Sequence, residues 1–197
     1  MLGELDLADA QAAFRAIARA SPGGLGAAPA EDVRHPPSMD LRAAMALAAD
    51  RDSIARLYRD GYAALFNLGL EALGSDFSPM ATPTNGPPDA ATVAAVQRLY
   101  LALLGNIADS HIVRIHGDAV AHIVMTAAQG WLARAYRRGG LDTDPDFAAW
   151  DEALKADRIN PGTTADLTVA VLLIAGLTGG QRSAAPPARP GGTDRDT

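Results

Sequence analysis

Apolar residues recur along this chain at spacings of three and four positions, which is typical of helices that bury one face. Runs that alternate apolar and polar residues, as exposed strands do, are hard to find. Asp, Ser, Pro and Gly stand where such helices should start and stop. We therefore predict an all-α protein with helices at residues 5–20, 38–47, 52–73, 90–107, 109–138 (broken near Gly117), 144–154 and 161–178.

The segments between these helices have the composition of loops. Residues 21–37 and 74–89 are rich in Pro, Gly, Ser and Thr, and the second segment could also form a mobile lid. From Gly179 onward the chain has almost nothing to bury, so we expect disorder there. The prediction is a compact multi-helix domain over residues 1–178 and a disordered C-terminal tail over residues 179–197.

Composition narrows the class further. The chain has 197 residues, 48% of them hydrophobic but only 5% aromatic, so one domain with a core of Ala, Leu, Val and Ile is expected. A net charge of −6 argues against nucleic-acid binding, and the absence of cysteine excludes disulfides and thiolate chemistry. The longest apolar run, Leu167–Leu177, is too short for a bilayer, and the acidic N-terminus does not read as a signal peptide. We expect a cytoplasmic protein without a membrane partner.

Two polar clusters in the first third of the chain could bind a phosphate or a metal ion. Closely spaced glycines let backbone N–H groups approach a phosphate, which makes Gly23, Gly24 and Gly26 candidates; a helix C-cap and linker is the alternative. Asp50 and Asp52 flank Arg51, and this cluster could hold Mg²⁺ or orient a ribose, although charged residues at a helix junction are usually caps.

A third cluster contains Asp109, Ser110, His111 and Arg114. On one helix His111 and Arg114 share a face, because they are three positions apart. An acid, an imidazole and an arginine this close could supply a metal ligand, a general acid and a phosphate clamp. The alternative is an exposed helix start capped by Asp109 or Ser110.

The clearest local signature surrounds Pro161. Thr163 as N-cap with Asp166 at the third helical position predicts a capping box. Asn160, Gly162, Thr163 and Thr164 would also present donors and acceptors at a positive helix end, which suits a sugar or a phosphate.

This signature, Asn160-Pro161-Gly162-Thr163-Thr164-Ala165-Asp166-Leu167-Thr168-Val169-Ala170, resembles the C-terminal motif of the triphosphoribosyl-dephospho-CoA synthase family. Three further segments resemble family segments in the same order. They are Pro22-Gly23-Gly24-Leu25-Gly26 with Asp32-Val33, Ala44-Met45 through Ala49-Asp50-Arg51-Asp52-Ser53-Ile54-Ala55, and Asp109-Ser110-His111-Ile112-Val113-Arg114.

The resemblance implies an all-helical transferase that moves the triphosphoribosyl group of ATP to the 2′-hydroxyl of 3′-dephospho-CoA and releases adenine. It implies ATP as substrate, Mg²⁺ at Asp50 and Asp52, and catalytic roles for Asp109 and Asp166. The nucleotide would then contact Gly23, Gly24, Gly26, Arg51, Ser110, His111, Arg114, Asn160, Gly162, Thr163 and Thr164.

Family members also carry a Pro-Gly-Asn segment and an Asn-Thr-Asn-Leu-Gly segment ahead of the first matching segment, and this sequence does not contain them. We therefore expect the chain alone to lack transfer activity and to expose apolar surface that favours a homo-oligomer. The alternative function is that of a truncated or divergent helical protein that binds a nucleotide or a partner without turnover.

Overall fold

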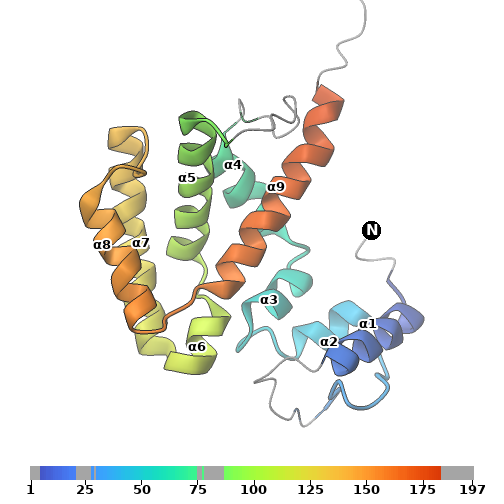
Figure 1. The fold of residues 1–197 in the computed structure, drawn as a ribbon. Coiled ribbons are helices and arrows are strands. Elements are labelled where there is room, and N and C mark those ends of the chain that lie inside the picture. Colours follow the sequence, from blue (N-terminus) through green and yellow to red (C-terminus); the bar gives the residue numbers. More distant parts are fainter. Residues whose placement is uncertain (1–4, 21–27, 29, 75–76, 78–86, 183–197) are drawn as a thin grey trace, which may run out of the picture.

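The computed structural model describes residues 5–20, 28, 30–74, 77 and 87–182. Within these ranges the regular structure is helical throughout, and no described residue lies in a strand, which confirms the predicted all-α fold (Figure 1). The predicted phosphate-binding glycines Gly23, Gly24 and Gly26 lie outside the described residues.

The N-terminal helices are α1 (Leu7–Ala20), α2 (Leu41–Ala46) and α3 (Ser53–Arg59). A reciprocal capping box starts α1, because the Asp6 carboxylate accepts from the Ala8 amide at 2.7 Å while that of Asp9 accepts from the Asp6 amide at 3.0 Å. Asp40 caps α2 through the Ala43 amide at 2.9 Å. The expected helix start at residue 38 is therefore two residues early.

The continuous helix predicted over residues 52–73 is wrong. After α3, Gly61 (φ +63°) and Tyr62 (φ +59°) take left-handed backbone conformations, and the chain resumes as a π-helical segment (Leu65–Gly69) and α4 (Leu70–Leu73). Gly69 of this segment packs against Val171 of the last helix, α9 (Gly162–Arg182). A Cβ atom there would be 2.5 Å from Cγ2 of Val171, so only glycine permits this crossing.

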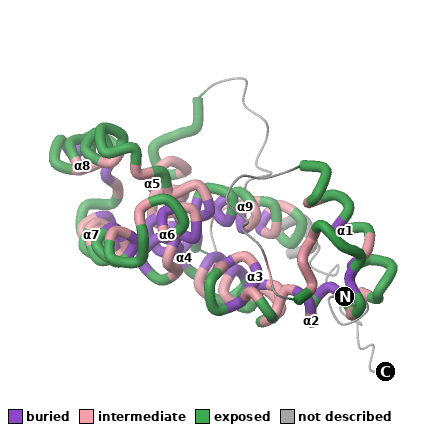
Figure 2. Tube along the Cα trace, turned by 90° about the horizontal axis from the view of Figure 1, so that it is seen from below, coloured by how far each residue is buried: buried purple, intermediate pink, exposed green. Residues whose placement is uncertain are grey.

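The central helix is α5 (Ala90–Asn106), which is apolar around its circumference. Leu99 and Leu103 pack with residues of α9 and the π-helical segment, whereas Leu101 and Leu104 pack with α6 (Ser110–His116) and α7 (Asp118–Arg138). Figure 1 shows α5 between α7 and α9, and Figure 2 shows that buried positions concentrate on the inner helices. These two core clusters share α5, and a third cluster, with Ala10, Phe14, Leu41 and Ala44, packs α1 against α2.

The C-terminal helices follow the expected boundaries closely. Gly117 (φ +86°) separates α6 from α7, as predicted, and Asp144 caps α8 (Pro145–Ala156). Helix α9 runs to Arg182, beyond the expected boundary at Gly179, and residues 183–197 of the expected tail lie outside the described residues. No single helix among the described residues is long and apolar enough to span a membrane, although α5 and α6 pass that test as a pair bent by 54°.

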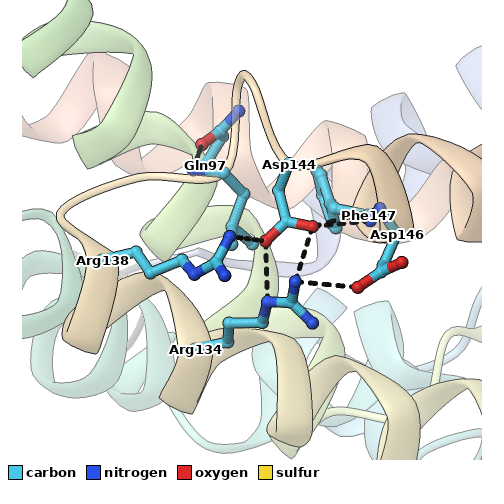
Figure 3. Close-up of polar contacts among 7 residues, drawn as sticks. Gln97, Arg134, Arg138, Asp144, Asp146 and Phe147 are labelled. Atoms are coloured by element: carbon cyan, nitrogen blue, oxygen red, sulfur yellow. Dashed lines mark hydrogen bonds and ion pairs between the residues drawn. The ribbon is translucent and has the colours of Figure 1, made fainter.

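An ion cluster fixes α8 against α7 (Figure 3). The Asp144 carboxylate lies 2.7 Å from Nε of Arg134 and 2.8 Å from a guanidinium nitrogen of Arg138, and it accepts from the amides of Asp146 and Phe147 at 3.1 and 3.4 Å. Burial acts to raise the pKa of Asp144, but the Phe147 amide and the charge of Arg134 outweigh it, so the pKa lies below its usual value.

Candidate functional site

A cavity of about 480 Å³ lies between the N-terminal helices and α6. Figure 1 shows α1 and α2 beside α3, at the end of the molecule opposite α7 and α8. Apolar side chains from α1 to α3, such as Phe14, Met45 and Ile54, form much of its wall. Its polar lining consists of Glu31, Asp32, Arg51, Asp52, Ser110 and Arg114. The structure thus brings together members of two clusters that are about sixty positions apart in the sequence.

The charged residues that line this cavity differ in whether they are paired. Arg51 and Arg114 form no ion pair with any described residue. Asp32, by contrast, is paired with Arg34 at 2.6 Å, and this hydrogen bond, with one from the Ala28 amide, holds the pKa of Asp32 well below its usual range. Glu31 accepts from the Ser38 amide at 2.9 Å. Within the part of the chain that the structure describes, Asp32 and Glu31 therefore have hydrogen-bonding partners, while neither arginine is paired with a carboxylate.

Arg114 is held by His111, as their spacing predicted. A terminal guanidinium nitrogen of Arg114 lies 2.8 Å from Nδ1 of His111. Because a guanidinium is only a donor, Nδ1 must accept, and the neutral ring then carries its proton on Nε2. A Cβ atom at Gly162 would lie 3.6 Å from Cγ of His111, so the imidazole packs against the start of α9. His111 thus links the Asn160–Thr164 turn to a cation of the cavity.

Asp109 is a buried cap for two helices at once. One carboxylate oxygen accepts from the amides of His111 (2.9 Å) and Ile112 (3.1 Å) at the start of α6. The other accepts from the amide (2.7 Å) and the hydroxyl (2.8 Å) of Thr164 in α9. With 2% of its surface exposed and four donors bound, this carboxylate has no lone pair left for a ligand in this conformation.

The predicted capping box at Thr163 is wrong, because α9 already begins at Gly162 and Asp109 supplies its cap from another helix. The Thr163 hydroxyl instead lies 3.1 Å from that of Ser110, which accepts from the Ser53 hydroxyl at 3.0 Å. We call Ser53, Asp109, Ser110, Thr163 and Thr164 the polar junction. It joins α3, α6 and α9 under the cavity floor at Ser110.

The remaining predicted residues lie apart from each other. Asp166 is exposed on α9 and does not line the cavity. The side chain of Asp50 is fully exposed, with Arg59 at 3.9 Å, and Asp52 caps α3 through the Ala55 amide at 2.8 Å. Asn160 lines a second cavity, beside α8.

A metal centre built only from the protein does not fit the described residues. No group of three His, Asp or Glu side chains among them could hold an ion. Mg²⁺ commonly binds one or two carboxylates together with substrate phosphates. Asp52, which lines the cavity, suits an ion that arrives on a nucleotide, whereas Asp50 does not line it.

Sequence reasoning missed two parts of this site. Ser53 belongs to a segment that resembles the family, but nothing in the sequence predicts its contact with Ser110, 57 positions away, and the apolar wall has the pattern of ordinary helix residues. Asp32 stands in another family-like segment and Glu31 directly precedes it, but their pairing with Arg34 and Ser38 depends on the loop conformation.

Fold and site together define an all-helical protein with a cavity that Arg51 and Arg114 line, next to a junction of three helices. The particular family follows from comparison: residues 1–184 match the family model of ATP:dephospho-CoA triphosphoribosyl transferase, and the chain belongs to that family. The match supports transfer of a triphosphoribosyl group from ATP to dephospho-CoA at the level of the family. Neither the curated proteins nor the solved structures contain a match to this chain.

Proposed function

We propose that the cavity between α1, α3 and α6 binds the triphosphate of MgATP, as the donor site of a triphosphoribosyl transferase. The observation that carries this proposal is the pair of arginines, Arg51 and Arg114, which lack ion partners among the described residues and line one cavity. Guanidinium groups bind phosphate oxygens through two parallel hydrogen bonds, so two of them suit a polyphosphate. The apolar wall at Phe14 and Met45 suits the base or the ribose.

In the proposed reaction the bond between C1 of the ATP ribose and N9 of adenine breaks. A bond forms between that C1 and the 2′-oxygen of 3′-dephospho-CoA, and the 2′-hydroxyl proton ends on the released adenine, so atoms and charge balance. The ribose passes through a state with positive charge at C1, which nearby negative groups stabilise. Asp52 is the cavity carboxylate for which only one partner, the Ala55 amide, is present among the described residues, and we assign it to the nucleotide or its Mg²⁺.

Asp109 then has a positioning role in this proposal. Its four hydrogen bonds fix the relative placement of α6 and α9, and α6 carries Ser110 and Arg114 into the cavity. Ser110, Thr163 and Thr164 act through the same junction, and Gly162 packs against the imidazole of His111.

Arg114→Ala should weaken MgATP binding by about 1.5 kcal/mol, or roughly tenfold, because a charged hydrogen bond to phosphate is lost. Titration calorimetry on the full chain measures this effect. Arg137→Ala is the matched control, since Arg137 is an exposed arginine in the last turn of α7 and lines neither cavity. Equal losses of MgATP affinity in both variants would mean that Arg114 acts only through nonspecific charge attraction. The triphosphate would then not bind in this cavity.

Binding without turnover is the second candidate function. One observation favours it: of the two carboxylates predicted to be catalytic, Asp109 is saturated and Asp166 lies outside the cavity. Adenine release from ATP in the presence of dephospho-CoA, followed by chromatography, separates the two functions. Release at about 1 per second would establish the transferase. MgATP binding with no adenine release would establish the binding protein.

A further inference from the structure

His111 contacts an arginine of the cavity between α1, α3 and α6 without lining that cavity itself. Arg114 does line the cavity. Among the described residues, Nδ1 of His111 is the acceptor that the Arg114 guanidinium has, at 2.8 Å. The direction in which this guanidinium points is therefore set by its bond to the imidazole.

The imidazole is fixed more firmly than the arginine it holds. His111 is half-buried, and its amide donates to the Asp109 carboxylate at 2.9 Å. A Cβ atom at Gly162 would lie 3.6 Å from Cγ of His111 and 3.7 Å from the side-chain nitrogen of Asn160, so the ring packs beside the turn that precedes α9. Arg114, by contrast, is exposed. If the bond between the two side chains breaks, the arginine is thus the partner that can move.

The charged group in direct contact with this imidazole is Arg114. The Asp109 carboxylate binds the amide of His111 and not its ring. The Asn160–Thr164 segment, which packs against the ring, has no charged residue. Other charged groups on the neighbouring elements form no hydrogen bond with the ring within the described ranges; they are Glu31, Asp32, Arg51 and Asp52 around the cavity, Asp118 in α7, Arg158 before α9 and Asp166 in α9.

Uptake of a proton by His111 is incompatible with this contact. A neutral imidazole accepts a hydrogen bond at Nδ1, whereas the protonated ring carries hydrogen on both nitrogens and a positive charge that repels a guanidinium. Histidine is the side chain that ordinarily changes charge roughly between pH 5 and 8. We propose that His111 is a positioning residue for Arg114, and that its protonation turns Arg114 away from the triphosphate and weakens MgATP binding. This proposal rests on the proposed function and adds a control by pH to it.

The test compares the MgATP affinity of the wild-type chain with that of His111→Asn at each pH. The asparagine oxygen takes the place of Nδ1 and accepts from Arg114, but an amide does not titrate. Between pH 7.5 and pH 5.5 we expect the ratio of wild-type to variant affinity to fall about fivefold, with the loss expected for Arg114→Ala, about tenfold, as its limit. Protonation of the nucleotide and of His35, His116 and His122 is common to both chains, so it cancels in the ratio. Titration calorimetry measures the affinities, and melting temperatures at both pH values verify that the chains are folded.

Two further comparisons separate positioning from other roles. At pH 7.5 His111→Asn should bind MgATP more tightly than His111→Ala, which offers no acceptor to Arg114. In chains that carry Arg114→Ala, the effect of His111→Asn on affinity should no longer depend on pH, because the residue that His111 positions is gone.

A ratio that stays constant with pH overturns the role of His111. So does a ratio that rises as the pH falls, since the protonated imidazole would then bind the phosphate directly. A pH dependence that persists in the Arg114→Ala chains, or equal affinities of His111→Asn and His111→Ala at pH 7.5, also overturns it. A wild-type chain that binds no MgATP at pH 7.5, or an unchanged affinity in Arg114→Ala, overturns the proposed donor site as well.

Discussion

Asp109 and Asp144 are both buried aspartates that cap a helix, yet they are stabilised in different ways. Asp109 accepts hydrogen bonds from neutral donors of α6 and α9, 55 residues apart at the farthest. Asp144 pairs with two arginines of α7, at most 10 residues away. The cluster at Asp144 therefore fastens two consecutive helices, whereas Asp109 fastens the start of α9 to the start of α6, from which α7 and α8 separate it in the sequence. A long-range cap of this kind determines the geometry of the cavity.

The largest expected effect is that of Asp109→Ala. It leaves four donors without their partner, in a site that is 2% exposed, so we expect a loss of about 3 kcal/mol or more in the free energy of unfolding. Urea denaturation at pH 7 measures it. Asp40→Ala, which removes an exposed cap of α2, should cost about 1 kcal/mol. Similar losses in the two variants would mean that Asp109 is an ordinary cap.

The second-largest expected effect is the contribution of Asp144 to the pH dependence of stability. Its pKa lies below the usual value of 3.8 in the folded state and returns to that value on unfolding. Its contribution is thus complete above about pH 4, and it is lost as the pH falls from there through the folded pKa. In Asp144→Asn the urea midpoint should be lower at pH 7, and it should fall less between pH 5 and pH 2.5 than in the wild-type chain. Asp142→Asn, which changes an exposed neighbour, should follow the wild-type curve.

The contrast between local and long-range contacts also explains which features the sequence predicted correctly. The break at Gly117, the helix start at Asp144 and the helix face that His111 and Arg114 share are local features, so the sequence predicted them. The prediction for the cap of α9 is wrong because the acceptor is Asp109, which precedes α6 and lies 55 residues away. Thr163 and Asp166 have the spacing of a capping box, but the structure does not form one. The left-handed backbone of Tyr62 and Arg158 also carries no sequence signal, since glycine is absent from both positions.

The cavity between α1, α3 and α6 shows how far the sequence could predict the site residues. Arg51 and Arg114 were predicted as phosphate contacts from their separate clusters, and the fold places both at one cavity. Asp50, the neighbour of Arg51, has a fully exposed side chain, because successive residues at a helix junction point in different directions. Which member of a polar cluster faces inward depends on packing, and packing is a tertiary property.

The smallest expected effect isolates one bond of the polar junction. Thr164→Val removes the hydroxyl that donates to Asp109 at 2.8 Å but keeps the shape of the side chain and the amide that donates at 2.7 Å. We expect a loss of about 1.5 kcal/mol in the free energy of unfolding, the usual contribution of one hydrogen bond to a charged group. Thr164→Ser keeps the hydroxyl and should lose less, even though it removes a buried methyl group. If the valine variant loses no stability while the serine variant does, the methyl group and not the hydroxyl stabilises the start of α9, and Asp109 holds that helix through the amide alone.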